Sequence, residues 1–386
     1  MTTTSFRYRF REWKKSLEPR VKEFRFALVR IRKSPLSFIG LFIILFFVAV
    51  AVSAPFIAPP NPSWDLSKVS DPFIIPKARY DVPPSPPDLG HPFGLTANGF
   101  DVYYGCVWGT ITAFRIGLLV VIVSLIIGLT VGLSAGYYGG ITDEVLMRFT
   151  DVIICFPGLI LSMAVVVAVP SMFYLSGLTV LIPLAAFFSI FTAVGFVSFS
   201  RGHRKQTLVL TAVASALLAT VALVLGGILS DVTVLINLTT LDKVVLALCL
   251  VSWPGYTRVI RGEVLRTRSE DYVEAAKAVG CSDFRIIIHH IVPNTVYPIL
   301  IMASMDIGSI VLLAAALSFI GVGAQSNFAD WGQLIQQSQE QIVGAGLINF
   351  WYIWLIPGAF IFMFSLGWNL LGDAVRDILD PTLRRR

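Results

Sequence analysis

The residues that could do chemistry are few and widely spaced. The four cysteines contain no C-x-x-C pair, and the four histidines have no partners at the spacing of metal ligands. No G-x-x-x-x-G-K-[ST] phosphate-binding loop occurs. The pattern therefore predicts no metal site, no catalytic residue and no cofactor bound by this chain.

One stretch predicts a contact with another molecule rather than a reaction. Residues 271–279 are good helix formers with acids at their start, which suits the positive end of a helix dipole. Gly280 suits a helix stop. Ala275 and Ala276 give the segment a small-residue surface against which another protein can press. On these residues alone, a solvated amphipathic loop is an equal alternative.

The composition places these residues in a membrane protein. Of the 386 residues, 55% are hydrophobic and 14% are charged, against roughly 25% charged in soluble domains. The mean hydropathy is +0.76. A soluble fold of this length leaves too much of its surface in water to hide so many apolar side chains. The sequence therefore excludes a soluble enzyme or a disordered chain and predicts an all-α polytopic membrane protein.

Apolar runs of about 20 residues are long enough to cross a bilayer as helices. Eight such spans are expected, near 36–58, 114–136, 152–169, 174–199, 207–229, 243–257, 296–322 and 348–371. The tail 1–34 carries eleven Lys and Arg against three acids, which predicts a cytoplasmic N-terminus. Eight spans put every basic cluster on that side, together with the loop 258–295 and the C-terminus.

The organisation around these spans is expected to be uneven. Residues 35–112 hold the first span and a proline-rich segment, and residues 113–381 hold the remaining spans. Eleven prolines in 55–100 exclude a helix or a central strand over most of that stretch and predict an irregular external loop.

Two features are expected inside the membrane. Gly128, Gly132, Gly136 and Gly140 recur every four residues, so one helix face would let another backbone approach closely. Asp306 falls deep in the span 296–322, where an ionisable side chain is costly and usually faces a cavity or a partner. It is expected either to line a path and attract a cationic group, such as a peptide amino terminus, or to be protonated or hydrogen-bonded between helices.

An ordered series of motifs resembles a known family. The run Glu274-Ala275-Ala276, followed by Gly280 and Pro293, resembles the EAA loop of ABC importer permeases. Segments similar to the peptide/nickel permease subfamily are Gly136–Gly140, Phe156-Pro157-Gly158, Trp253-Pro254-Gly255, Ala316–Gly321, Trp331-Gly332 and Asn369–Asp373. Ser34-Pro35 and His91-Pro92-Phe93-Gly94 at the front resemble the C-type subunit of dipeptide and oligopeptide importers.

The resemblance implies a six-span type I permease core in the cell (inner) membrane, with Glu274, Ala275, Ala276 and Gly280 coupling it to ATPases. It implies four partners besides the bilayer: a second homologous permease, two cytoplasmic ATPase subunits that hold ATP and Mg, and an external solute-binding protein. The chain itself would be no enzyme and would bind no nucleic acid. Its cargo would be di- or oligopeptides, with nickel or oligosaccharides as alternatives within the class. An ion-coupled secondary carrier is the alternative from another class.

The sequence departs from the family pattern in three places. Residues 171–242 predict two additional transmembrane helices inserted into the core. The segment Leu95–Asp101 lacks the first acid and the arginine of the usual Thr-Asp-x-x-Gly-Arg-Asp run. Ala314 occupies a position where the family often has an acid, while Asp306 lies two helical turns earlier.

Overall fold

The computed structural model describes residues 34–60, 62, 65, 71–78, 84–175, 234–325, 327–342 and 346–379. Five of the described helices are long and apolar enough to span a membrane, and a bent pair makes up to six. The prediction of a polytopic helical membrane protein is confirmed. The two spans expected at 174–199 and 207–229 lie outside the described residues, except for positions 174 and 175, which belong to a strand.

The described elements follow one another in this order: α2 (Pro35–Ile57), α3 (Val102–Tyr138), α4 (Gly140–Ile154), α5 (Gly158–Ala168), β1 (Met172–Leu175), β2 (Val234–Asn237), α8 (Thr240–Arg268), α9 (Asp271–Ala278), α10 (Asp283–Ile286), the π-helix η1 (Ile287–Ile291), α11 (Val292–Phe319), α12 (Trp331–Gln336), the 3-10 turn η2 (Gln339–Gln341), α13 (Gly346–Asn349) and α14 (Trp351–Leu379).

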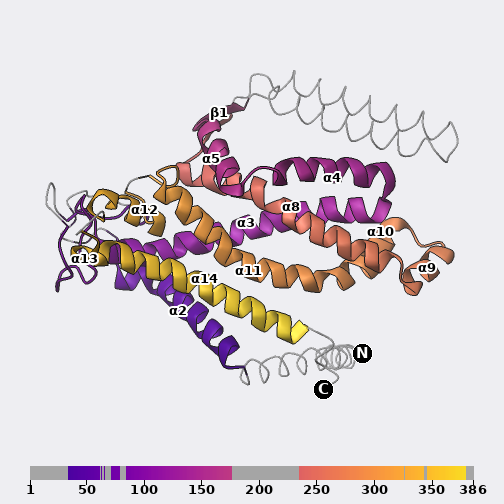
Figure 1. The fold of residues 1–386 in the computed structure, drawn as a ribbon, viewed down its shortest axis with the longest axis horizontal. Coiled ribbons are helices and arrows are strands. Elements are labelled where there is room, and N and C mark those ends of the chain that lie inside the picture. The colour runs from indigo at the N-terminus through magenta and orange to yellow at the C-terminus, as the bar shows by residue number, and fades with distance from the viewer. Residues whose placement is uncertain are drawn as a thin grey trace, which may run out of the picture.

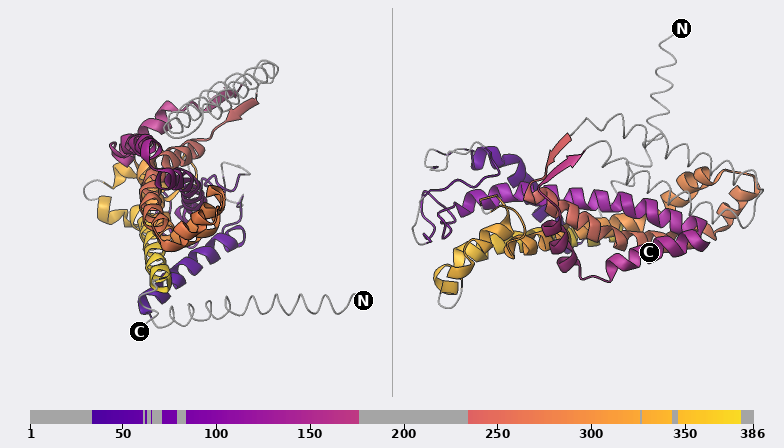
Figure 2. Two further views of the ribbon diagram at one scale, coloured as in Figure 1. Left: turned by 90° about the vertical axis from the view of Figure 1, so that its right-hand side faces the viewer. Right: turned by 90° about the horizontal axis from the view of Figure 1, so that it is seen from above.

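The long helices α2, α3, α8, α11 and α14 run lengthwise beside one another (Figure 1). The helices α9 and α10 lie at one end of this bundle and α12 and α13 at the other, and the views in Figure 2 agree. The strands β1 and β2 pair antiparallel, with Met172 opposite Asn237. They bring the start of α8 to the end of α5, on either side of the undescribed residues 176–233.

Local sequence explains where several helices begin. The Ser34 side chain accepts a hydrogen bond from the Ser37 amide, and Pro35 fills the first helical position of α2. The Asp101 carboxylate accepts from the Tyr104 amide, at 2.8 Å, and so caps α3. At α8, Thr239 and Asp242 form a reciprocal capping box. These caps satisfy amides that have no partner within the helix.

The span expected near 152–169 is not one continuous helix in the structure. Residues 140–154 form the helix α4, which meets α5 at an angle of 88°. Pro157 lies at the break because proline lacks an amide and disfavours a helical residue before it. The sequence did not predict the helix α4, because α4 is amphipathic, with acids on one face, and is not a continuous apolar run.

The seam between α3 and α8 explains three of the four glycines in the ladder. A Cβ at Gly128, Gly132 or Gly136 would lie 2.5, 2.9 or 2.8 Å from the Cβ of Tyr256, Ile260 or Val264. The two helices therefore approach as closely as only glycine permits. Gly140 is not part of the seam. It begins α4 with φ of +55°, and no atom lies within 4 Å of a Cβ placed there.

Residues 71–78, 84–101 and 327–342 form a structure at one end of the bundle, called here the cap. The Ile75 amide donates to Asn327 O at 2.8 Å, and the Ala329 amide donates to Phe73 O at 2.7 Å. Stacked rings of Phe73 and Phe328, with centroids 5.8 Å apart, cover these bonds. The proline-rich segment is irregular, as expected. Ile74 pairs with Phe328, about 250 positions later, whereas Lys77 and Ser85 pair with Phe100 and Leu95 nearby in the chain.

Trp331 anchors the cap to the helices. Its side chain is 1% exposed, and its indole Nε1 donates to Cys106 O of α3 at 3.0 Å. Gly109 leaves room for the indole, since a Cβ there would lie 2.8 Å from it. The short helix α12 is thereby fixed inside the bundle's end.

Candidate functional site

The helix α9 presents two different faces. Val273 is fully buried and Ala276 is half-buried in a cluster with Ile260, Val264 and Ile286. Glu274 and Ala275 are exposed. Side chains three residues apart lie on one helix face, so burial of Val273 and Ala276 turns the next residues outward. The outward face is acidic and carries a small side chain.

Gly280 ends this element, as the sequence predicts. Its φ is +82°, in the left-handed region that glycine adopts without strain. The Gly280 amide donates to Lys277 O at 2.9 Å, and the Cys281 amide donates to Ala276 O at 3.1 Å. These two bonds satisfy carbonyls at the helix end and turn the chain toward α10.

The segment 269–291, called here the α9 loop, is tied to the end of α3. Arg268 Nη1 donates to Tyr137 O at 2.8 Å, so a cation neutralises the negative end of the α3 dipole. The Tyr137 hydroxyl donates to Asp283 Oδ1 at 2.5 Å, and Lys277 Nζ lies 5.6 Å from the centre of the Tyr137 ring. A helix of only eight residues is thus held at both ends by α3.

Two ion pairs join the neighbouring α4 to α8. Arg261 donates to both carboxylate oxygens of Asp143, at 2.5 and 2.6 Å. Arg258 donates to Asp151 at 2.7 Å. The fork of Arg261 matches the carboxylate in a bidentate manner, which fixes geometry as well as charge.

Large apolar side chains remain exposed on the α9 loop. Val279 is 85% exposed and Phe284 is 76% exposed. Both lie beside α9, one on each side of Gly280. An acidic face bordered by bare apolar groups, at the end of the bundle rather than along its length, is the form of a protein-docking surface. This surface performs no bond chemistry by itself.

The other expected site residue lies elsewhere. Asp306 is half-buried in the middle of α11, about 20 Å along the helix axis from its start. Its carboxyl interacts with the Tyr256 hydroxyl of α8, a fully buried group that has no hydrogen bond of normal geometry. Asp306 and α9 are therefore separate features, joined only through α8 and α11.

Sequence reasoning missed the residues that hold the α9 loop in place. Tyr137 and Asp283 are 146 positions apart, and Asp143 and Arg261 are 118 apart. A single sequence carries no signal of such pairs. Within the part of the chain that the structure describes, no group of three His, Cys, Asp or Glu side chains is placed to hold a metal ion.

A bundle of apolar helices, capped at one end and carrying a short exposed helix in a loop at the other (Figure 1), is the architecture of a polytopic membrane protein. The chain belongs to the family of binding-protein-dependent transport system inner membrane components, whose model matches residues 128–385. The N-terminal transmembrane domain model of oligopeptide transport permease C matches residues 24–80.

Curated relatives cover most of the chain. The dipeptide transport system permease protein DppC of Alkalihalophilus pseudofirmus is 28% identical over 94% of this chain and 91% of its own length. The glutathione transport system permease protein GsiD of Escherichia coli O157:H7 is 27% identical over 92% and 89%. The probable D,D-dipeptide transport system permease protein DdpC of Escherichia coli K12 is 28% identical over 91% and 89%.

A solved structure of an amino acid ABC transporter is 16% identical, with a TM-score of 0.38 over 73% of this chain and 94% of that one. This likeness is too slight to say more of the fold.

Proposed function

We propose that this chain is one of two related permease subunits in an ATP-driven importer of di- and oligopeptides. Family membership supports a role in binding-protein-dependent transport, and relatives named for dipeptide and glutathione transport support the cargo class. Nickel and oligosaccharide cargoes and an ion-coupled carrier find no support among these relatives. The energy would come from separate ATPase subunits, since this chain has no phosphate-binding loop.

The observation that carries the proposal is the two-faced helix α9. Its inner face is packed through Val273, while Glu274 and Ala275 face outward. The loop that contains α9 directly joins α8 to η1 and α11, so a force applied to α9 acts on two long helices at once. Motion of a soluble subunit can be passed to membrane helices through such a rigid connection.

The cytoplasmic side of the membrane would then be the side of the α9 loop. The arginines around it, Arg258, Arg261, Arg266 and Arg268, suit that orientation. The cap would face outward and receive the solute-binding protein. Glu274 would accept charge-assisted hydrogen bonds within a groove of the ATPase, with Ala275 seated against its wall.

A charge reversal at Glu274 tests this role. In vesicles that contain the complete importer, Glu274→Lys should lower ATP-driven peptide uptake at least tenfold and abolish stimulation of ATP hydrolysis by the loaded binding protein. The control is Glu144→Lys, which makes the same change at an exposed position of α4. Normal uptake by Glu274→Lys would contradict the proposal.

We further propose that Asp306 lines the path and meets the amino terminus of the peptide. A half-buried acid in the middle of a span supports this role, and its interacting group among the described residues is Tyr256, a neutral side chain. Asp306→Asn should raise the KM for peptides with a free amino terminus and leave N-acetylated peptides unaffected. If the variant takes up each peptide type as well as the wild type does, Asp306 has only a structural role.

A further inference from the structure

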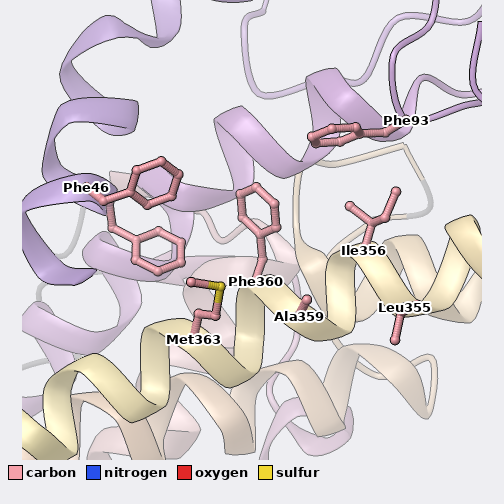
Figure 3. A pocket seen from close by; sticks show the side chains of 8 residues that line it. Phe46, Phe93, Leu355, Ile356, Ala359, Phe360 and Met363 are labelled. Atoms are coloured by element: carbon pink, nitrogen blue, oxygen red, sulfur yellow. The ribbon is translucent and has the colours of Figure 1, made fainter. Parts of the chain in front are cut away.

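A groove of about 380 Å³ lies between α2 and α14 at the cap end of the bundle. Phe46 and Phe47 line it from α2, and Ala359, Phe360 and Met363 line it from α14. Figure 3 shows Phe360 and Met363 rising from α14 toward Phe46, with Phe93 of the cap beyond them. All eight lining side chains are apolar, so the groove offers nothing to a charged or hydrogen-bonding ligand.

The groove exists because the two helices cross at a close contact and then diverge. A Cβ at Gly40 would lie 2.6 Å from Leu370 Cβ, and one at Gly367 would lie 2.8 Å from Ile43 Cγ2. The two helices therefore touch on the side of Phe46 that is remote from the cap. From Phe46 toward the cap they separate, so the space between them is wedge-shaped.

The depth of the wedge matches the hydrocarbon of one leaflet. Trp351 and Trp354 lie in the first turn of α14, where aromatic rings mark a membrane interface. Leu355 and Met363 follow Trp351 by about 6 and 18 Å along the helix. One leaflet contributes about 15 Å of hydrocarbon. Most of the lining residues thus lie within the leaflet that adjoins the cap, and Met363 lies near its inner limit.

We propose that this groove binds one acyl chain of a phospholipid from the leaflet beside the cap. The entrance is continuous with the lipid-facing surface, since Phe46 is 46% exposed, Leu355 46% and Met363 40%. A single flexible acyl chain needs no polar partner and can follow the apolar wall of the groove. Close contact with the aromatic side chains would hold such a chain longer than bulk lipid.

A bound chain would buttress the cap. Phe47 and Phe360 form the wall of the groove, with ring centroids 5.9 Å apart. Both rings also contact Trp331, at 5.9 and 5.8 Å, and Trp331 anchors α12. Phe47 is 1% exposed and Phe360 is half-buried, so the chain would contact this aromatic cluster mainly through Phe360.

The test is photo-crosslinking of the full chain, with its accompanying subunits, in nanodiscs of phosphatidylcholine that carries a diazirine in one acyl chain. We expect adducts at Phe46 and Met363 to exceed those at Val52, which is 72% exposed on α2, at least fivefold. Ala359→Trp should fill the groove and lower its adducts at least fivefold. Val52→Trp is the control and should leave them unchanged.

Three results would overturn the proposal. Equal labelling of Met363 and Val52, or groove labelling that persists in Ala359→Trp, would describe ordinary surrounding lipid. A disulfide formed in the dark between Met363→Cys and a cysteine of a second permease would show that a protein fills the groove. If Ala359→Trp fails to insert, Ala359→Leu replaces it, with an expected two- to threefold loss of adducts.

Discussion

The cap and the α9 loop lie at opposite ends of the same helices and are built in opposite ways. The cap folds onto its own chain: Trp331 is buried, and backbone hydrogen bonds join Phe73 and Ile75 to residues 327–329. The α9 loop buries Val273 but leaves Phe284 and Val279 bare. Since exposed apolar groups of that size mark contact surfaces, we propose that another subunit completes the α9 loop, whereas the cap packs against its own chain.

The largest difference between the two ends should appear when one aromatic side chain is truncated at each of them. Trp331→Ala removes a fully buried indole and its hydrogen bond to Cys106, so it should cost about 3–5 kcal/mol of stability. Phe284→Ala removes a ring that is 76% exposed and should change stability by under about 0.5 kcal/mol. Thermal unfolding of the isolated chain in detergent measures both.

In the assembled importer the two variants should rank in the opposite order for binding to the ATPase subunits. Phe284→Ala should weaken association with the ATPase subunits, while any folded cap variant should retain it. Equal destabilisation by Trp331→Ala and Phe284→Ala in the isolated chain would show that the two ends do not differ as described.

A smaller effect is expected at the seam that connects the ends. Gly132→Ala places a Cβ 2.9 Å from both Ile260 Cβ and Thr257 O, so α3 and α8 must separate, at a cost of about 1–3 kcal/mol. Gly262→Ala on α8 meets nothing within 4 Å and should stabilise the helix by about 0.5–1 kcal/mol. If both variants shift the unfolding midpoint in the same direction, the seam is not closely packed.

The smallest effect is a pH dependence in the cap. Burial raises the pKa of the Asp330 carboxyl above 3.8, although Ser318 and the amides at the start of α12 act in the opposite direction. A carboxyl with a raised native pKa holds its proton more tightly when folded. Its contribution to stability is complete below 3.8 and is lost as the pH rises through the native pKa.

Asp330→Asn keeps an acceptor for the Gln333 amide and cannot ionise. The unfolding midpoint of the wild type should therefore fall relative to that of Asp330→Asn as the pH rises above 3.8. Glu340→Gln removes an exposed carboxyl from the same cap and controls for the loss of charge. A wild-type midpoint that rises with pH relative to Asp330→Asn would contradict the sign.

What the sequence could predict was governed by local signals. Long apolar runs located α2, α11 and the start of α14 within a few residues, and helix formers followed by Gly280 located α9. The bend after α4 was not predicted, although Pro157 lies at it, because α4 is amphipathic and does not form a continuous apolar run. Gly140 fitted the four-residue spacing but follows a break in the helix at Gly139, where φ is +66°.

Long-range pairs lay beyond the sequence. Nothing local in the proline-rich segment shows that Ile75 meets Asn327, or that Tyr137 meets Asp283. Such contacts are fixed by the packing of the whole bundle. The two spans expected within 171–242 stay a prediction, because most of that segment lies outside the described residues.

The most direct test of the account asks what touches the outward face of α9. In the full importer, with Cys155 and Cys281 replaced because both are accessible, Ala275→Cys should cross-link to an ATPase subunit. The yield should change when ATP is bound, and impermeant maleimide added outside the cell should leave Cys at 275 unlabelled. Labelling from outside, or a cross-link to the solute-binding protein, would contradict the account.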